Sequence, residues 1–321
     1  MSQREGGVLA GVRERIGEQV GLVVIGQDEA LDHLLVAASV GGHVLLEGVP
    51  GVAKTLLARA FAATLGLGFR RVQFTPDMLP SDLTGTVALR PSADGQELAF
   101  RPGPIFTNVL LADEINRTPP KTQAALLEAM QEAQVSVDGV SHALPAPFVV
   151  VATQNPIEYE GTYPLPEAQL DRFLLKVDVG YPRAEDELAI LALAHRGVAP
   201  ATLDDVRPVA TAETLSHARD EVDTTAVTAE VAGYVVALVR RTRELPSVSL
   251  GASPRAAVHL LAASRAAARL AGRAFVTPDD VAAMARPVLR HRLVLRPEAE
   301  LERYRPDDAV AAALASVPVP R

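Results

Sequence analysis

The sequence predicts an α/β fold, with a five-stranded, mostly parallel sheet covered by helices on both faces and followed by a small all-α domain. Five short apolar runs alternate with helical or loop segments, as they do when crossover helices join parallel strands. A glycine-bearing loop, residues 48–55, connects the first run to a helix-forming segment. After Tyr181-Pro182 the chain becomes alanine-rich and helical, so we place the domains at 1–182 and 183–321. The runs are residues 44–46, 72–74, 109–112, 148–152 and 174–179.

Composition limits the possible functions. The 321 residues include 31 basic and 39 acidic side chains, and the resulting net charge of −8 gives no general attraction to nucleic acid or anionic lipid. The chain has no cysteine, which excludes disulfides, thiolate metal sites and cysteine nucleophiles. Charged residues in the first twenty positions argue against a signal peptide, and no apolar run approaches the length of a bilayer span. We expect a cytoplasmic protein without membrane insertion.

The first elements lead up to the glycine-bearing loop. Residues 8–20 and 28–40 are predicted to be helices on either side of Gly26-Gln27, where the helical pattern breaks. The loop Gly48-Val-Pro-Gly-Val-Ala-Lys-Thr55 then joins the first strand to a helix over 56–65. Its glycines allow a tight turn that aims N–H groups inward, and the helix adds the positive end of its dipole. Such a loop binds a polyphosphate.

The pattern of the loop assigns individual roles. Lys54 is expected to reach the β- and γ-phosphates of ATP, and the Thr55 hydroxyl to hold Mg²⁺. Ala53 stands where the pattern has a second glycine, and we expect it in the first helical turn with a negative φ. The residues expected to contact nucleotide are Gly48, Val49, Pro50, Gly51, Val52, Ala53, Lys54 and Thr55.

Polar groups follow the next two strands at the same predicted sheet edge. Asp113 and Glu114 end the run 109–112; Asp113 suits the Mg²⁺ shell, and Glu114 suits a base that polarises water. The alternative is a pair that caps the following helix, but Thr118 is expected to supply that cap. Asn155 follows the run 148–152 and could position the water, although an Asn-Pro pair also occurs in turns.

Two stretches are insertions into this core. Residues 75–104 are rich in proline and glycine, and residues 134–144 predict a β-hairpin that turns at Asp138-Gly139. In the second domain, a helix is predicted over 224–243, with the apolar stripe Val227, Val231, Tyr234, Val235 and Leu238. Two more helices are expected to start at Ser253-Pro254 and Thr277-Pro278, each with a capping hydroxyl before proline.

Together these motifs resemble the AAA+ ATPases and, within them, the MoxR family. The resemblance covers nearly all of the chain. It is carried by residues 48–55, Thr75-Pro-Asp-Met-Leu-Pro-Ser-Asp-Leu-Thr-Gly85, Asp113-Glu-Ile-Asn-Arg117, Thr153-Gln-Asn-Pro156, Leu165-Pro-Glu-Ala-Gln-Leu-Asp-Arg-Phe173 and Ser253-Pro-Arg255.

The resemblance implies an ATP hydrolase with ATP and Mg²⁺ as ligands, an AAA+ P-loop core and a helical lid. Residues 48–55 are then Walker A, Asp113 and Glu114 end Walker B, Asn155 is sensor 1 and Arg255 is sensor 2. Arg172 is the arginine finger offered to a neighbouring subunit, with Arg117 as a second candidate. The insertions correspond to the helix 2 insert and the pre-sensor 1 hairpin, and Gly26-Gln27 to the segment beside adenine.

From the residues alone, Arg255 and Arg172 can each also be given an ordinary structural role. A cation at position 255, in the first turn of a helix, is disfavoured by the dipole unless an anion is close, and ATP would be that anion. Otherwise Arg255 is a surface residue. Arg172 could equally pair with Asp171 or Asp178.

The resemblance further implies a homo-oligomeric ring, expected to be hexameric. Such a ring would remodel or activate a protein partner with a von Willebrand factor A domain. Alternatives are a nucleic-acid motor, a chelatase-type motor subunit or a metabolite kinase. The hairpin 134–144 has no Lys or Arg, which disfavours nucleic acid. A kinase would leave the helical domain and Arg255 unexplained.

Overall fold

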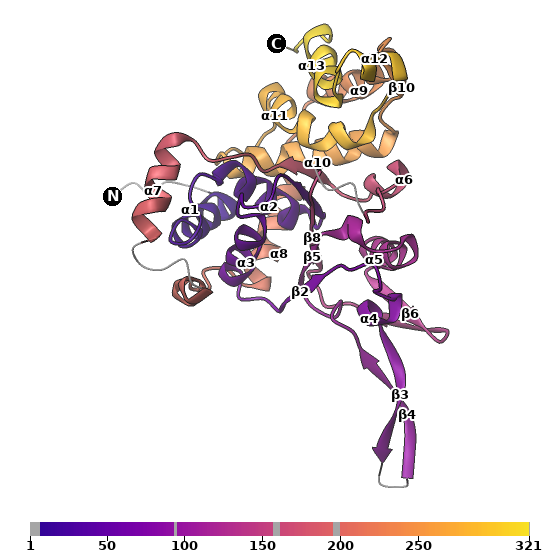
Figure 1. Ribbon diagram of the computed structural model, residues 1–321. Coiled ribbons are helices and arrows are strands. Elements are labelled where there is room, and N and C mark those ends of the chain that lie inside the picture. The colour runs from indigo at the N-terminus through magenta and orange to yellow at the C-terminus, as the bar shows by residue number, and fades with distance from the viewer. Residues whose placement is uncertain (1–6, 93–94, 157–160, 195–199, 321) are drawn as a thin grey trace.

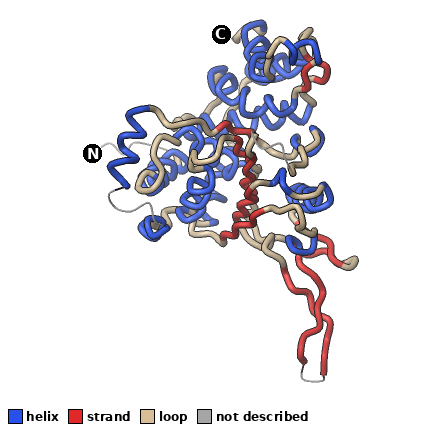
Figure 2. Tube along the Cα trace, in the orientation of Figure 1, coloured by secondary structure: helices blue, strands red, loops and turns tan. Residues whose placement is uncertain are grey.

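The computed structural model describes residues 7–92, 95–156, 161–194 and 200–320. A five-stranded sheet crosses the middle of the molecule in the order β2-β5-β8-β1-β9, and every neighbouring pair is parallel (Figures 1 and 2). The predicted fold class is confirmed, and each apolar run supplies one strand. The strands are β1 Val44–Glu47, β2 Phe69–Gln73, β5 Val109–Asp113, β8 Val149–Gln154 and β9 Leu175–Asp178.

Both faces of the sheet are buried at the central strands β5, β8 and β1, which explains why these strands are almost continuously apolar, whereas the edge strands β2 and β9 combine buried and exposed residues. Successive residues of β5 point to opposite sides, as the pleat requires. Val109 and Leu111 join the cluster formed with α1, α2 and α3, whereas Leu110 and Ala112 join the cluster formed with α5. These helices are α1 Val8–Val20, α2 Asp28–Val40, α3 Lys54–Thr64 and α5 Pro120–Glu132. The first two have the bounds that the sequence predicted.

The start of α5 differs from expectation. Pro119 is its N-cap, and the buried Thr118 hydroxyl has no hydrogen-bond partner, so Thr118 does not supply the cap. The first-turn N–H groups of Thr122 and Gln123 bond to the carbonyl of Pro119 instead. The Pro119 carbonyl therefore accepts the hydrogen bonds from the first turn of α5 that we expected the Thr118 hydroxyl to accept.

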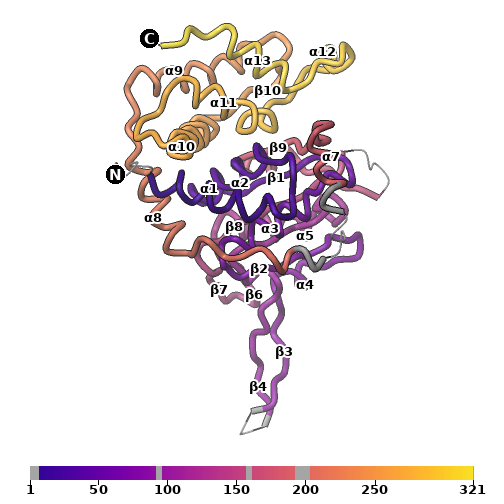
Figure 3. Tube along the Cα trace, turned by 90° about the vertical axis from the view of Figure 1, so that its left-hand side faces the viewer, coloured from indigo at the N-terminus to yellow at the C-terminus, as the bar shows by residue number. Residues whose placement is uncertain are grey.

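The two insertions form antiparallel hairpins. The predicted turn at Asp138-Gly139 is confirmed: both residues have positive φ, 51° and 80°, between β6 Gln134–Val137 and β7 Val140–Ala143. The longer insertion begins with the short helix α4 Pro80–Thr84 and continues into β3 Gly85–Ser92 and β4 Gly95–Pro102. This β3–β4 hairpin projects well beyond the body of the molecule (Figures 1 and 3).

Beyond residue 182 the chain is largely helical, as predicted, with one short ladder that we did not predict. Strands β10 and β11 pair antiparallel there. The elements are α7 Ala184–Ala194, α8 Ala212–Asp223, α9 Ala229–Thr242, β10 Val248–Leu250, α10 Pro254–Leu270, α11 Pro278–Leu289, β11 Val294–Leu295, α12 Pro297–Leu301 and α13 Pro306–Ser316, with 3₁₀ turns at Pro200–Asp205 (η2) and Arg290–Arg292 (η3). In the core, the 3₁₀ turn η1 Ile115–Arg117 lies between β5 and α5, and the short helix α6 Glu167–Leu170 precedes β9.

Helix starts in this part correct two expectations. Helix α9 begins at Ala229 under a Thr228 cap, and not at 224, because Thr224 ends α8 and Ala226 bridges to Phe275. Ser253 makes no side-chain cap, because Ala256 N–H bonds to its carbonyl and leaves its buried hydroxyl unpartnered.

Other predicted features of these helices are confirmed. Thr277 accepts a hydrogen bond from the N–H of Asp280, so it caps α11 as expected. The apolar stripe of α9 is buried except for Val227, which precedes the helix and is partly buried.

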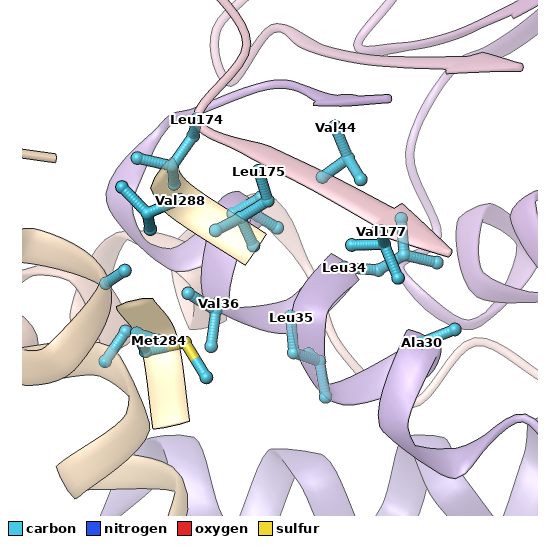
Figure 4. Close-up of a cluster of buried hydrophobic side chains, with 14 of the residues drawn as sticks. Ala30, Leu34, Leu35, Val36, Val44, Leu174, Leu175, Val177, Met284 and Val288 are labelled. Atoms are coloured by element: carbon cyan, nitrogen blue, oxygen red, sulfur yellow. The ribbon is translucent and has the colours of Figure 1, made fainter. Parts of the chain in front are cut away.

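The helices after residue 182 pack closely on the core. Figure 4 shows Met284 and Val288 of α11 beside Val36 of α2 and Leu175 of β9 in one buried cluster. Helix α8 packs on α1 and α2 in the same cluster. The boundary at 182 stays a prediction. Among the described residues, no helix combines the length and apolarity that a membrane span needs.

Candidate nucleotide-binding site

The loop between β1 and α3 has the backbone that a phosphate site needs. A Cβ on Gly48 would lie 2.4 Å from the carbonyl oxygen of Val179, so no larger residue fits there without a shift. Gly51 has a φ of +88°, which favours glycine. The loop therefore turns tightly at the carboxyl end of a parallel strand and leads directly into α3. Its N–H groups and the N-terminus of α3 together suit a bound phosphate.

Our expectation for Ala53 was wrong. The residue precedes the helix as its N-cap and has a left-handed backbone, with φ 64° and ψ 20°. Gly51, two residues earlier, also has a positive φ, so the loop bends on both sides of Val52. An alanine held in this left-handed conformation carries strain of about 1–2 kcal/mol that glycine would avoid.

Lys54 lies over the loop with its ammonium group turned back onto it. The Nζ atom donates to the carbonyls of Gly48, at 2.5 Å, and Val49, at 2.8 Å. These contacts place the charge at the centre of the loop, where a phosphate would also lie.

Asp113 ends β5 beside Thr55, as the sequence predicted. The Thr55 hydroxyl lies 3.2 Å from Oδ2 of Asp113, and the Thr153 hydroxyl donates to Oδ1 at 2.5 Å. Arg71 of β2 contacts Oδ2 through Nη2 at 2.7 Å and Nε at 3.0 Å. The carboxylate is buried, and an arginine balances its charge.

The paired oxygens of Thr55 and Asp113 fit Mg²⁺, which prefers oxygen ligands and keeps several waters. No cluster of three His, Cys, Asp or Glu side chains occurs in the described part of the chain, so no all-protein metal cage accompanies them there. A hydroxyl and a carboxylate at the end of a phosphate loop suit a cation that also binds phosphate oxygens.

Glu114 follows Asp113 with a left-handed backbone, at φ 57°, which directs its side chain along the sheet edge. Its Oε2 atom accepts from Gln73 Nε2 at 2.6 Å and pairs with Arg117 Nε at 3.2 Å. Its N–H donates to the Thr153 hydroxyl at 2.9 Å. The carboxylate thus lies at the mouth of the site.

A cavity of about 500 Å³ unites the loop with the polar strand ends. It brings together Lys54, Thr55, Asp113, Glu114 and Asn155, all five of which the sequence placed at this sheet edge. Five other lining residues had no predicted role in the site: Leu56, Arg71, Gln73, Thr153 and Gln154. The signal was the alternation of Arg71, Val72 and Gln73 on β2, whose pairing sets Gln73 opposite Asp113.

Arg172 and Arg255 do not line this cavity. They lie together on a second one, of about 350 Å³, with Asp171 and His259. Arg255 Nη1 is 3.8 Å from Asp171 Oδ2, so a carboxylate lies beside the start of α10. We expected an anion beside Arg255, and Asp171 is one; the predicted contact of Arg255 with ATP stays a prediction.

The alternative partners of Arg172 are taken by other arginines. Asp171 pairs with Arg292 and Arg255, and Asp178 pairs with Arg290. Within the residues that the structure describes, the Arg172 guanidinium has no ion-pair partner. The alternative role of Arg172, a salt bridge with Asp171 or Asp178, is therefore not found among the described residues.

Gly26 and Gln27 line a third cavity, of about 250 Å³. Gln27 Nε2 donates to the carbonyl of Gly180 at 3.2 Å, which ties this loop to the chain just after β9. A Cβ on Gly26 would lie 2.9 Å from Asp186 Oδ2, so α7 closes over the same place.

Comparisons with known proteins agree with this geometry. The model of the ATPase family associated with various cellular activities (AAA) matches residues 43–175, and an AAA lid domain model matches residues 240–313. The uncharacterized protein YeaC of Bacillus subtilis is 47% identical over 303 residues, 94% of this chain and 93% of YeaC. Chaperone MoxR1 of Mycobacterium tuberculosis is 43% identical over 317 residues, 96% of this chain and 82% of MoxR1.

The crystal structure of a proposed ATPase from Cytophaga hutchinsonii superimposes with a TM-score of 0.87 at 37% identity, covering 98% of this chain and 97% of that one. Likeness over nearly full length extends from the phosphate loop to the helical lid. The chain therefore belongs to the MoxR family of AAA+ ATPases and is an ATP hydrolase.

Proposed function

We propose that this chain works as a subunit of a homo-oligomeric ring, expected to have six members, in which each ATP is hydrolysed between two chains. The observation that carries the proposal is the separation of the two cavities. The phosphate loop and its carboxylates line one, whereas Arg172 and Arg255 line another. Arginines that stabilise phosphoryl transfer must reach the phosphates, so these two would serve the loop of a neighbouring chain.

Within one chain, the loop side would bind ATP and activate water. The loop N–H groups and Lys54 would hold the phosphates, while Thr55 and Asp113 would hold Mg²⁺. The metal, when bound, neutralises charge on the β- and γ-phosphates. Glu114 would take a proton from the attacking water, and Asn155 would orient that water. To act as the base, Glu114 must turn from Gln73 and Arg117 toward the cavity.

The adenine base would lie near Gly26 and Gln27. Their cavity is an apolar slot with polar edges: its apolar lining is Val20, Val24, Ile25 and Leu31, and its polar lining is Gln27, Asp28 and Asp186. Arg117, in the turn η1, remains a second candidate for contact across the subunit boundary.

The work of the ring would be to remodel or activate a protein partner, and the resemblance points to one with a von Willebrand factor A domain. The β3–β4 hairpin supports a protein rather than a nucleic-acid partner. Arg90 stands opposite Glu97 across its strands, and the apolar pair Leu89 and Leu98 is exposed beside them. Nucleic-acid tracking needs unpaired basic groups.

The proposal is tested by mixing two inactive variants. Arg172→Ala removes the finger and Glu114→Gln removes the base, so each alone should hydrolyse ATP at least about 10²-fold more slowly. Mixed at equal concentrations, about one interface in four keeps both groups, since ring interfaces are heterologous. Activity should therefore return to roughly a quarter of the wild-type value. No recovery in verified mixed oligomers would contradict a site shared between chains.

A further inference from the structure

A buried arginine in the lid holds the segment that carries Arg172. Arg292 lies in the turn η3, and its side chain is only 2% exposed. Its guanidinium donates to the side chain of Asp171 at 2.7 Å and to the backbone carbonyls of Asp171, at 3.2 Å, and Phe173, at 2.6 Å. It therefore holds the residues immediately before and after Arg172.

Arg292 makes further hydrogen bonds to the core and to the lid. On the core side, Arg292 donates to the carbonyl of Leu174 at 3.3 Å. On the lid side it donates to the carbonyl of Val288 and to His259 Nδ1, the latter at 2.7 Å. Figure 4 shows Leu174 packed beside Val288 at this junction. One side chain thus joins the lid to the core at the position of the proposed finger.

The same network sets the charge beside Arg255. Burial, followed by the nearby Arg292 charge, lowers the pKa of His259 to about 4, so the ring is neutral at pH 7 and can accept from Arg292. Asp171 faces two arginines that differ in accessibility. Arg292 is buried and 2.7 Å away, whereas Arg255 is 52% exposed and 3.8 Å away.

We infer that Arg292 is a positioning residue for ATP hydrolysis, which fixes the backbone around Arg172 and keeps Asp171 neutralised so that Arg255 is free to leave it for a phosphate. This inference rests on the proposed function, in which Arg172 and Arg255 serve a neighbouring chain. The planar fork of arginine makes these simultaneous contacts, and a lysine ammonium cannot reproduce them.

The test uses Arg292→Lys, which keeps the charge and loses the fork. Its own phosphate loop is untouched, so ATP affinity and KM should stay within about twofold of wild type. A misplacement near 1 Å at a reacting group costs about 10²-fold, so kcat should fall by about that factor. Mixing Arg292→Lys with Glu114→Gln should restore activity. Mixing it with Arg172→Ala should not, because Arg292→Lys and Arg172→Ala impair the same side of the interface.

A matched control comes from the same turn. Arg290 also joins the lid to the core, through Asp178 of β9, and pairs with Asp307, but no hydrogen bond or ion pair of the described residues joins its side chain to residues 171–174. Arg290→Lys should lower the urea midpoint about as much as Arg292→Lys and leave kcat within about twofold. If both variants lose kcat equally, Arg292 is only structural and the inference is wrong.

Two further outcomes remain decisive. If Arg292→Lys does not fold, Asp171→Asn replaces it and should give the same kcat loss and the same pattern of rescue; wild-type kcat in that variant would overturn the inference. The mixture of Arg172→Ala with Glu114→Gln serves as the reference. If the reference recovers and the Arg292→Lys mixture with Glu114→Gln does not, this inference fails alone; if the reference does not recover, the proposed function fails.

Discussion

Asp113 shows how one residue can be both buried and ready for a cation. A carboxylate removed from water needs compensation by charge and hydrogen bonds. Arg71 supplies the charge from the neighbouring strand, and the hydroxyls of Thr55 and Thr153 supply the rest. Arg71 is 47% exposed, so it can leave Asp113 at a modest cost when a metal takes its place.

Substitutions of Lys54 and Glu114 should impair different steps, ATP binding and ATP hydrolysis respectively. Lys54→Ala removes charge-assisted contacts to phosphate, each worth about 1.5–3 kcal/mol, so ATP affinity should fall by about 10² or more. Glu114→Gln keeps the shape and loses the base, so ATP should bind normally and persist. Calorimetry with ATP measures the first effect, and single-turnover hydrolysis measures the second.

The exposed Lys121 of α5 provides the control for removing a positive charge. Lys121→Ala should leave ATP affinity unchanged. If Lys54→Ala and Glu114→Gln lost equal affinity, binding and catalysis would not be divided between the two residues as we describe.

At the residue scale, the sequence predicted the groups that belong to a contiguous motif. Asp113 and Glu114 are readable because they end and follow a strand, and Lys54 and Thr55 because they close the glycine-bearing loop at the start of a helix. Arg71 and Gln73 could not be found in the same way, since their role depends on β2 pairing with β5. Only the strand order brings them to Asp113 and Glu114.

His43 links three elements. Its Nδ1 accepts from the N–H of Val150 in β8 at 3.0 Å, and its Nε2 lies 3.0 Å from the carbonyl of Met130 in α5. The residue itself leads into β1. A neutral ring with the proton on Nε2 satisfies both contacts. Burial is the main cause that lowers its pKa to about 4.

This arrangement makes stability depend on pH. In the unfolded chain His43 binds a proton near pH 6.5, and in the folded chain only near pH 4, so the stability is complete above 6.5 and is lost as the pH falls toward 4. The free energy of unfolding should drop by about 2 kcal/mol between pH 7 and pH 5 from this residue alone. Urea denaturation at both pH values measures the drop.

His43→Gln can keep both hydrogen bonds and does not titrate. Its loss of stability between pH 7 and pH 5 should be about 2 kcal/mol smaller than that of the wild type. His217→Gln, on the exposed face of α8, is the matched control and should lose as much as the wild type. An unchanged pH dependence in His43→Gln would rule out a neutral buried ring.

Elements with long periodic signals were predictable, and short or strained ones were not. Helices α1 and α2 and the five sheet strands follow from apolar patterns. The β3–β4 hairpin contains Pro91 and Pro102, which hid its strands in a stretch that looks like a loop. Strands β10 and β11 have three and two residues, too few for an alternating pattern to appear.

At the scale of the whole molecule, the lid and the core form one packed unit. Helix α11 contributes to the same buried cluster as α2 and β9 (Figure 4). Arg292 also bonds to both parts. The cavity that holds Arg172 and Arg255 is therefore built from lid and core together. A rigid body of this kind can present both arginines to a neighbour at fixed separation.

The most direct test of hydrolysis between chains is the specific ATPase activity of the wild-type chain as a function of its concentration. Because a finger supplied across a boundary is worth about 10³ to 10⁵ in rate, activity per chain should be nearly zero at dilution. It should then rise in step with oligomer formation measured by light scattering on the same samples. A specific activity that stays constant while the oligomer dissociates would show that one chain suffices and would contradict the account.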